Sequence, residues 1–123
     1  MSDAAIERTP GQTALLPAAT SFGQLVITSG LVSPRALGGE QLTIEHEIAE
    51  ALAELIRVLE HAGSRADRVL KLDAFLASAD DFDEWNRQYQ AHWPDERPAR
   101  TTLVSGFTTP LIRFEVQATA ARI

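Results

Sequence analysis

A stretch of helical periodicity from residue 43 to residue 62 constrains this chain more than any other feature of its sequence. Apolar residues recur there at intervals of three and four positions, which places them along one stripe of an α-helix. The stripe consists of Ile44, Ile48, Leu52, Leu55 and Leu59. Thr43 is a suitable N-cap, and Gly63 is placed to end the helix. We expect the opposite side of this helix to face water; it carries Glu47, Glu50, Glu54, Arg57 and His61.

The apolar stripe of this helix requires a partner surface, and the rest of the chain supplies one as β-strands. Apolar, β-branched or alternating runs predict strands at residues 24–28, 69–76, 100–105 and 112–121. Residues 33–41 predict a turn-rich connection with room for a short edge strand, and residues 80–92 predict a second helix. We therefore expect one domain over residues 1–123, of the α+β class, with two helices packed on one face of a mixed sheet.

Composition and charge exclude several classes of function. The chain has no cysteine, which excludes disulfides, thiolate metal sites and cysteine nucleophiles. Its formal net charge of −6 disfavours a general attraction to nucleic acid. The first ten residues lack the apolar run of a signal peptide, and no window is long and apolar enough to span a bilayer. We therefore expect a cytosolic protein with no nucleic-acid partner and no membrane partner. We also expect no metal site, because its three histidines are widely dispersed.

The last two predicted strands carry the most informative polar residues. If residues 106–111 form the loop of an antiparallel hairpin, Arg100 faces Gln117 and Thr102 faces Glu115, all on one face of the sheet. Arg100 and Glu115 would then be diagonal neighbours, with room for a small molecule between their charged groups. An arginine can hold a carboxylate through two hydrogen bonds, and a glutamate can accept a proton from water. A plain cross-strand ion pair explains the same pattern and is the simpler interpretation.

Other polar positions leave two interpretations open. Asn86 points either into a cleft or into water, and the pair Ser29 and Gly30 provides either backbone donors or a simple turn. Phe82, Trp85 and Tyr89 have the spacing of a helical stripe, which favours a place in the core over a stacking platform.

Several segments resemble the RidA/YjgF family, which is also called endoribonuclease L-PSP. Residues 25–30, which read LVITSG, are similar to the first long strand of the family with its Ser-Gly end. Residues 69–76 and 81–89 are similar to its central strand and second helix. The most specific likeness is RPART at residues 97–101 followed by FEVQA at residues 114–118, which resembles the RPARS segment and the last strand of the family.

The resemblance implies a chorismate-mutase-like (YjgF-like) fold assembled as a homotrimer, with ligand clefts between adjacent subunits. Active members of the family hydrolyse enamine and imine intermediates such as 2-aminoacrylate to 2-keto acids and ammonia, without a cofactor. By this resemblance Arg100 would hold the carboxylate of a small imine or 2-keto acid, and Glu115 would activate water. The other residues expected to contribute to substrate binding are Ser29, Gly30, Thr102, Leu16 and Asn86.

Three positions depart from the pattern of active members. Leu16 stands where many members have a tyrosine, Gln117 stands where many have a second glutamate, and Leu31 stands where glutamine is common. Loss of the tyrosine hydroxyl makes the cleft more apolar, which fits an imine bulkier than aminoacrylate. The alternative is a non-catalytic relative that binds a small carboxylate or a partner protein. Ribonuclease activity, suggested by the second family name, is the least compatible with the acidic balance.

Overall fold

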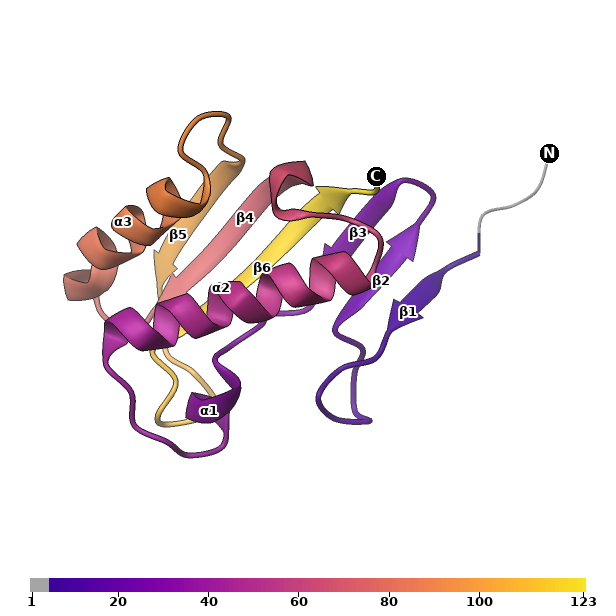
Figure 1. Cartoon of the computed structure of the whole chain (residues 1–123). Helices are drawn as coiled ribbons and strands as arrows, with labels where there is room; N and C mark the ends of the chain where they lie inside the picture. The colour runs from indigo at the N-terminus through magenta and orange to yellow at the C-terminus, as the bar shows by residue number, and fades with distance from the viewer. Residues whose placement is uncertain (1–4) are drawn as a thin grey trace.

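The protein is described here by a computed structural model that covers residues 5–123 (Figure 1). Its strands are β1 (Glu7–Thr9), β2 (Ala19–Phe22), β3 (Leu25–Thr28), β4 (Val69–Leu76), β5 (Ala99–Val104) and β6 (Phe114–Ala121). Its α-helices are α1 (Pro34–Leu37), α2 (Ile44–His61) and α3 (Phe82–His92). The six strands form a single mixed sheet in the order β1-β2-β3-β6-β4-β5.

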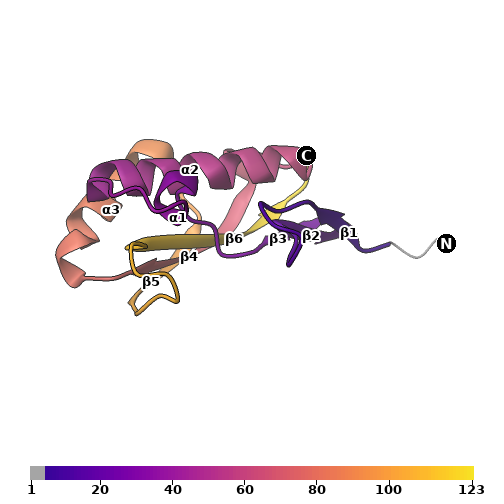
Figure 2. The same ribbon diagram turned by 90° about the horizontal axis from the view of Figure 1, so that it is seen from below.

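All three helices lie on one face of this sheet. Figure 2 shows α1, α2 and α3 above the strands and only the loop between β5 and β6 below them. The two long helices and the mixed sheet confirm the predicted α+β fold. None of the helices within residues 5–123 is both long enough and apolar enough to cross a membrane.

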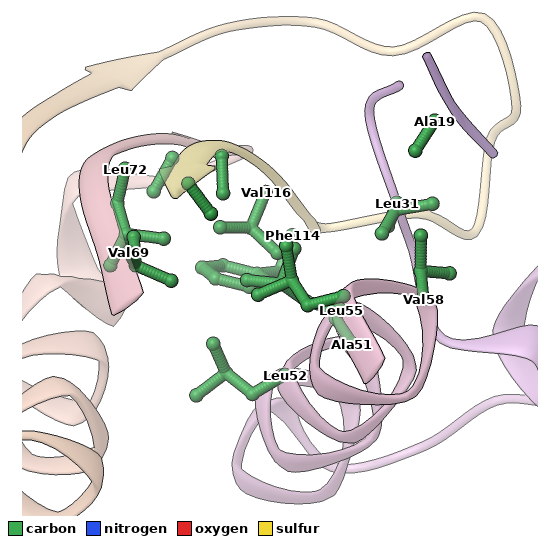
Figure 3. Close-up of a cluster of buried hydrophobic side chains, with 14 of the residues drawn as sticks. Ala19, Leu31, Ala51, Leu52, Leu55, Val58, Val69, Leu72, Phe114 and Val116 are labelled. Carbon is green, nitrogen blue, oxygen red and sulfur yellow. The ribbon is translucent and has the colours of Figure 1, made fainter. Parts of the chain in front are cut away.

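The apolar stripe of α2 forms one hydrophobic core with strands β4 and β6. Leu52 and Leu55 of α2 are fully buried together with Leu72 of β4 and with Phe114 and Val116 of β6 (Figure 3). Buried and partly exposed residues alternate along the whole of β6, as a strand with one covered face requires. Hydrophobic burial of about 25 cal/mol per Å² along this seam is the main stabilising term for the layer arrangement.

The ends of α2 match the sequence prediction. The Oγ1 atom of Thr43 accepts a hydrogen bond of 3.2 Å from the backbone N–H of His46. Gly63 follows the helix with a φ of 86°, a backbone conformation that favours glycine.

Two strands and one helix at the amino-terminal side were not predicted. β1 and β2 are short and partly exposed, so neither has a long alternating pattern that sequence periodicity could detect. β2 and β3 are joined by a two-residue turn in which Gly23 has a φ of 59°. The connection at residues 33–41 contains α1, and no strand, because Ser33 caps a helical turn that begins at Pro34.

The prediction that one side of α2 faces water is wrong for two of the glutamates on that side. Glu47 is 1% exposed and Glu54 is 9% exposed. The carboxylate of Glu47 accepts hydrogen bonds from the backbone N–H groups of Arg113 (2.7 Å) and Phe114 (3.1 Å). On the side of β6 that faces β3, the last paired residues are Leu31 and Val116, and the two amides lie beyond this pair. The Glu47 side chain therefore accepts the hydrogen bonds that a neighbouring strand would otherwise accept.

The predicted hairpin between the last two strands is also wrong. β4 lies between β5 and β6, pairing in parallel with β5 and antiparallel with β6. Leu72 of β4 is opposite both Arg100 and Ala118, whereas Phe75 is opposite both Leu103 and Glu115. The strand β4 leads through α3 directly into β5, and a strand–helix–strand connection of this kind favours parallel neighbours.

Replacement of the buried Glu47 is expected to destabilise the protein. Glu47→Ala leaves the two amides at the start of β6 buried without an acceptor, which should cost about 3 kcal/mol of the free energy of unfolding. Urea denaturation measures this loss. Glu60→Ala, at an exposed position of the same helix, is the matched control and should change the midpoint little. Equal midpoints for the two variants would contradict the buried role of Glu47.

Candidate functional site

The predicted site residues divide between the two faces of the sheet. Arg100 and Thr102 are opposite Leu72 and Ala74 of β4, whose side chains are buried beneath the helices. Glu115 is opposite Phe75, whose side chain lies on the open face. Within one subunit, therefore, Arg100 and Glu115 lie on opposite faces of the sheet and form neither a shared pocket nor an ion pair.

Arg100 lies against the aromatic stripe of α3. The Cζ atom of its guanidinium group is 4.5 Å from the ring centre of Tyr89, 5.5 Å from that of Trp85 and 5.6 Å from that of Phe82. Contacts of this kind stabilise a cation through the negative faces of the rings. The Nη1 atom of Arg100 is buried and has no hydrogen-bond partner, and it is the one such side-chain atom within residues 5–123. An unpaired buried donor is costly, and it suggests a missing acceptor.

The aromatic rings that contact Arg100 are themselves held by β5. The hydroxyl group of Tyr89 donates a 2.7 Å hydrogen bond to the carbonyl oxygen of Pro98. The indole N–H of Trp85 donates a 3.0 Å hydrogen bond to Oγ1 of Thr102. Asn86 is half-buried on the same side of α3 as Phe82 and Tyr89, because it lies four and three residues from them.

Glu115 is a half-buried carboxylate on the open face. Burial raises the pKa of Glu115, with no opposing hydrogen bond or ion pair from the described residues. It borders an open hollow of about 320 Å³ that is also lined by Phe75, Gln117 and the residues 105–108. Figure 2 shows the loop that contributes residues 105–108 below the sheet, away from the helices. A carboxylate with these surroundings is suited to accept a proton from water.

Ser29 and Gly30 form a bulge in the chain that follows β3. Ile27 pairs with Thr119, and Leu31 pairs with Val116. Three residues separate Ile27 from Leu31, whereas only two separate Val116 from Thr119, so the first strand has one extra residue. A Cβ atom on Gly30 would overlap Oε2 of Glu115 and lie 2.8 Å from its carboxyl carbon. The bulge therefore requires glycine at this position for Glu115 to lie where it does.

Ser29 and Leu16 border a second, smaller hollow. The Oγ atom of Ser29 donates a 2.7 Å hydrogen bond to the carbonyl oxygen of Pro17, which fixes the preceding loop to the end of β3. The hollow has a volume of about 140 Å³, and its lining includes Leu16, Ser29, Gly30 and Leu37. Leu16 is half-exposed there, in the apolar environment that the sequence suggested.

The structure thus groups the predicted residues as two half-sites. We call Arg100, Thr102 and the α3 aromatics the arginine half-site, and Glu115 with Gly30 the glutamate half-site. Ser29 and Leu16 border the separate small hollow, whose lining also includes Glu54 of α2. The stacking role of Phe82, Trp85 and Tyr89 was missed, although their spacing was recognised, because the sequence does not show which strand they cover. Among the described residues, no group of three or more His, Cys, Asp or Glu is arranged to hold a metal ion.

A comparison with known protein families decides the classification. The family model described as Endoribonuclease L-PSP matches residues 7–122, almost the whole chain. The chain belongs to the endoribonuclease L-PSP family.

Relatives and solved structures of this family are similar to the chain over most of its length. The chain is 33% identical over 88 residues to the mitochondrial protein mmf2 of Schizosaccharomyces pombe, covering 72% of this chain and 70% of mmf2. It is 32% identical over 98 residues to AldR of Lactococcus lactis, which is named as a candidate regulator. This match covers 76% of this chain and 78% of AldR. The predicted cytosolic location stays a prediction.

A member of the YjgF protein family from Neisseria meningitidis has a very similar structure. The TM-score is 0.85 at 26% identity, with 97% of this chain and 96% of that chain covered. A Thermotoga maritima protein whose structure is described as that of a candidate endoribonuclease gives a TM-score of 0.82 at 26% identity, with 100% and 98% covered. These neighbours confirm the YjgF-like fold of this family member.

The close approach of Gly30 to Glu115 predicts a coupled pair of substitutions. In this L-PSP family chain, Gly30→Ala should lower the free energy of unfolding by about 1 kcal/mol, because the Glu115 side chain must move its carboxylate away from the new methyl group. In a Glu115→Ala background the same change should cost clearly less, since the overlapping atoms are gone. Urea denaturation of the four proteins measures the coupling. Strictly additive effects would contradict the predicted contact.

The raised pKa of Glu115 predicts how its ionisation affects stability. Because burial favours the protonated form in the folded state, the stabilisation is present below the unfolded-state pKa and is lost as pH rises through the folded-state pKa. Glu115→Gln should therefore match the parent near pH ~4 and be more stable than the parent near pH ~7. Thermal unfolding across this range measures the difference. A difference in thermal stability between Glu115→Gln and the parent that narrows as the pH rises would contradict the raised pKa of Glu115.

Proposed function

We propose that this protein hydrolyses imines of small 2-amino acids to 2-keto acids and ammonia. Arg100 holds the substrate carboxylate, and Glu115 activates the attacking water. The observation that carries this proposal is the buried, unpartnered Nη1 atom of Arg100 among three aromatic rings. Membership in the endoribonuclease L-PSP family supports it at the level of the family.

The arginine half-site has the chemistry of a carboxylate receptor. A guanidinium group offers parallel N–H donors that match the two oxygens of a carboxylate. The rings of Tyr89, Trp85 and Phe82 exclude water on one side of the group without offering it an acceptor. A substrate carboxylate would supply the missing acceptor and bring the adjacent C=N carbon to a fixed place.

The glutamate half-site supplies the proton transfers that hydrolysis requires. An enamine first becomes an imine by gaining a proton on carbon and losing one from nitrogen. Glu115 then takes a proton from water as the oxygen bonds to the imine carbon. The same proton is passed to nitrogen, which gives an adduct with one hydroxyl and one amino group on the former imine carbon. The hydroxyl proton then also moves to nitrogen as the C–N bond breaks and the C=O bond forms, and the products are a 2-keto acid and ammonia. A carboxyl group whose pKa is raised by burial is better matched to both steps than an exposed one.

Two copies of the chain are needed to bring the half-sites together, because Arg100 and Glu115 of one subunit lie on opposite faces. Large apolar side chains are exposed on the edge strand β5 and on the open face of β3. Leu103 and Val104 of β5 are 53% and 59% exposed, and Leu25 and Ile27 on the open face of β3 are 46% and 53% exposed. Exposed apolar surface of this extent supports contact between copies, and we propose the homotrimer of the resemblance.

The second candidate is a protein that binds a small carboxylate without turnover. The half-exposed Leu16 at the small hollow favours it, because an apolar side chain supplies no polar contact to a reacting group. The name of AldR as a candidate regulator is compatible with such a role. Binding of 2-keto acids without ammonia release from any imine would favour this candidate over hydrolysis.

Arg100→Ala tests the proposed reaction. The variant should lower kcat/KM for ammonia release at least about 100-fold on a panel of imines generated in place by an amino-acid oxidase. Arg97→Ala is the matched control, because Arg97 lies three residues away, is exposed and, within residues 5–123, donates only to the carbonyl oxygen of Pro94. Ammonia release by Arg100→Ala at the parent rate would refute the mechanism.

A mixture of two inactive variants tests whether the site spans two subunits. Arg100→Ala and Glu115→Gln should each be inactive, but hybrid oligomers formed by unfolding and refolding them together should regain about a quarter of the parent activity. The regain arises because some contacts then join an intact Arg100 to an intact Glu115. No regain from verified hybrids would refute the two-subunit site.

A further inference from the structure

Two hydrogen bonds tie α3 to β5 on either side of Arg100. Tyr89 donates to the carbonyl oxygen of Pro98, two residues before Arg100, at 2.7 Å. Trp85 donates to the hydroxyl oxygen of Thr102, two residues after Arg100, at 3.0 Å. Thr102 lies two residues along β5 from Arg100 and therefore shares its face of the sheet. Pro98 immediately precedes β5 and accepts through its backbone carbonyl, so the two bonds hold the chain on both sides of Arg100.

The rings that make these bonds also enclose the guanidinium group. The Cζ atom of Arg100 is nearer to the ring of Tyr89 than to that of Trp85, at 4.5 Å and 5.5 Å. The rings restrict the rotamers of the long side chain but accept no hydrogen bond in their plane. The buried Nη1 atom is left as a donor without an acceptor, which is the preorganised state that anion binding requires.

The bond from Trp85 also sets the hydrogen-bonding role of Thr102. A hydroxyl group has one proton to donate, and its oxygen accepts from the indole N–H. The proton of Thr102 is therefore directed elsewhere, on the same face of β5 as Arg100. A hydroxyl donor two residues from a guanidinium donor suits an acceptor with two oxygens, such as a carboxylate.

We propose that Trp85 and Tyr89 are positioning residues for Arg100, and that the Thr102 hydroxyl and Arg100 donate together to one ligand carboxylate. This inference rests on the proposed function for the role of Arg100. It extends that function by assigning the carboxylate a second donor and the aromatic rings a purpose beyond packing. Binding of a carboxylate by this pair does not require turnover.

The chain offers a matched control for the tryptophan. The indole N–H of Trp93 donates a 2.8 Å hydrogen bond to the carbonyl oxygen of Ala66, and its ring is buried at the end of α3. It therefore resembles Trp85 in burial and in bonding, while Arg100 contacts only the rings of Phe82, Trp85 and Tyr89 within the described residues. Trp85→Phe and Trp93→Phe each remove one buried indole N–H.

The affinity of the assembled protein for 2-oxobutanoate, measured by calorimetric titration, tests the proposal. Trp85→Phe, Tyr89→Phe and Thr102→Val should each weaken binding about fivefold, the effect of one neutral hydrogen bond. Thr102→Ser should bind 2-oxobutanoate with the affinity of the parent, because serine keeps the hydroxyl group. Trp85→Phe combined with Thr102→Val should weaken binding by less than the product of the two effects, since both break the same bond. Trp93→Phe should bind within about twofold of the parent.

Two results would overturn the positioning role. One is equal weakening by Trp85→Phe and Trp93→Phe, which would mean that loss of stability alone explains the change. The other is parent affinity in both Trp85→Phe and Thr102→Val.

Failure of this inference is distinguishable from failure of the proposed function. Ammonia release that depends on Arg100, together with ligand binding that is indifferent to Trp85→Phe and Thr102→Val, would refute only the inference. Binding that responds to these changes in a protein that hydrolyses no imine would refute only the hydrolysis.

Discussion

The position of β4 between β5 and β6 is the constraint on which the rest of this molecule depends. By pairing with both strands, β4 places Arg100 on the face covered by the helices and Glu115 on the open face. The same arrangement makes β6 a central strand, whose apolar side chains pack against α2. It leaves β5 at the edge of the sheet, where its other side has no neighbouring strand in the described part of the chain.

Two ionisable groups in this framework lack partners that burial would normally demand. Aromatic rings pack against the guanidinium group of Arg100, but its buried Nη1 atom has no hydrogen-bond acceptor. Glu115 is half-buried, and burial raises its pKa. Glu47 shows the contrast, because one oxygen of its buried carboxylate accepts from the backbone amides of Arg113 and Phe114, and the other accepts from the Arg113 guanidinium group. Unsatisfied groups cost free energy of folding and tend to occur where a ligand completes the bonding. The unsatisfied state of Arg100 and Glu115 therefore supports the proposal that both bind a ligand.

Most of the secondary structure followed from local patterns, and the errors had identifiable causes. The helix at 44–61 and the last strand were predicted because each has a long run of the correct period. β1 and β2 were missed because they are too short and too exposed to show a period. Glu47 was placed in water because a helical wheel shows the charge of a side chain but not which loop lies over it. Phe82, Trp85 and Tyr89 of α3 were placed in the core, which is correct for Trp85 and wrong for Phe82, which is 40% exposed. Their contact with Arg100 depends on strand order.

The sequence by itself determined the two helices, the central strands, the α+β class and the family, because these depend on periodicity and on residues adjacent in the chain. It also determined which polar residues to consider, Arg100 and Glu115 first. Only the tertiary structure decided which faces they occupy. A strand shows its alternation in sequence but not its neighbour, and pairing β5 with β4 in place of β6 turns Arg100 to the opposite side of the sheet. For that reason the predicted placement of Arg100 and Glu115 on one face of the sheet gave way to two half-sites on opposite faces.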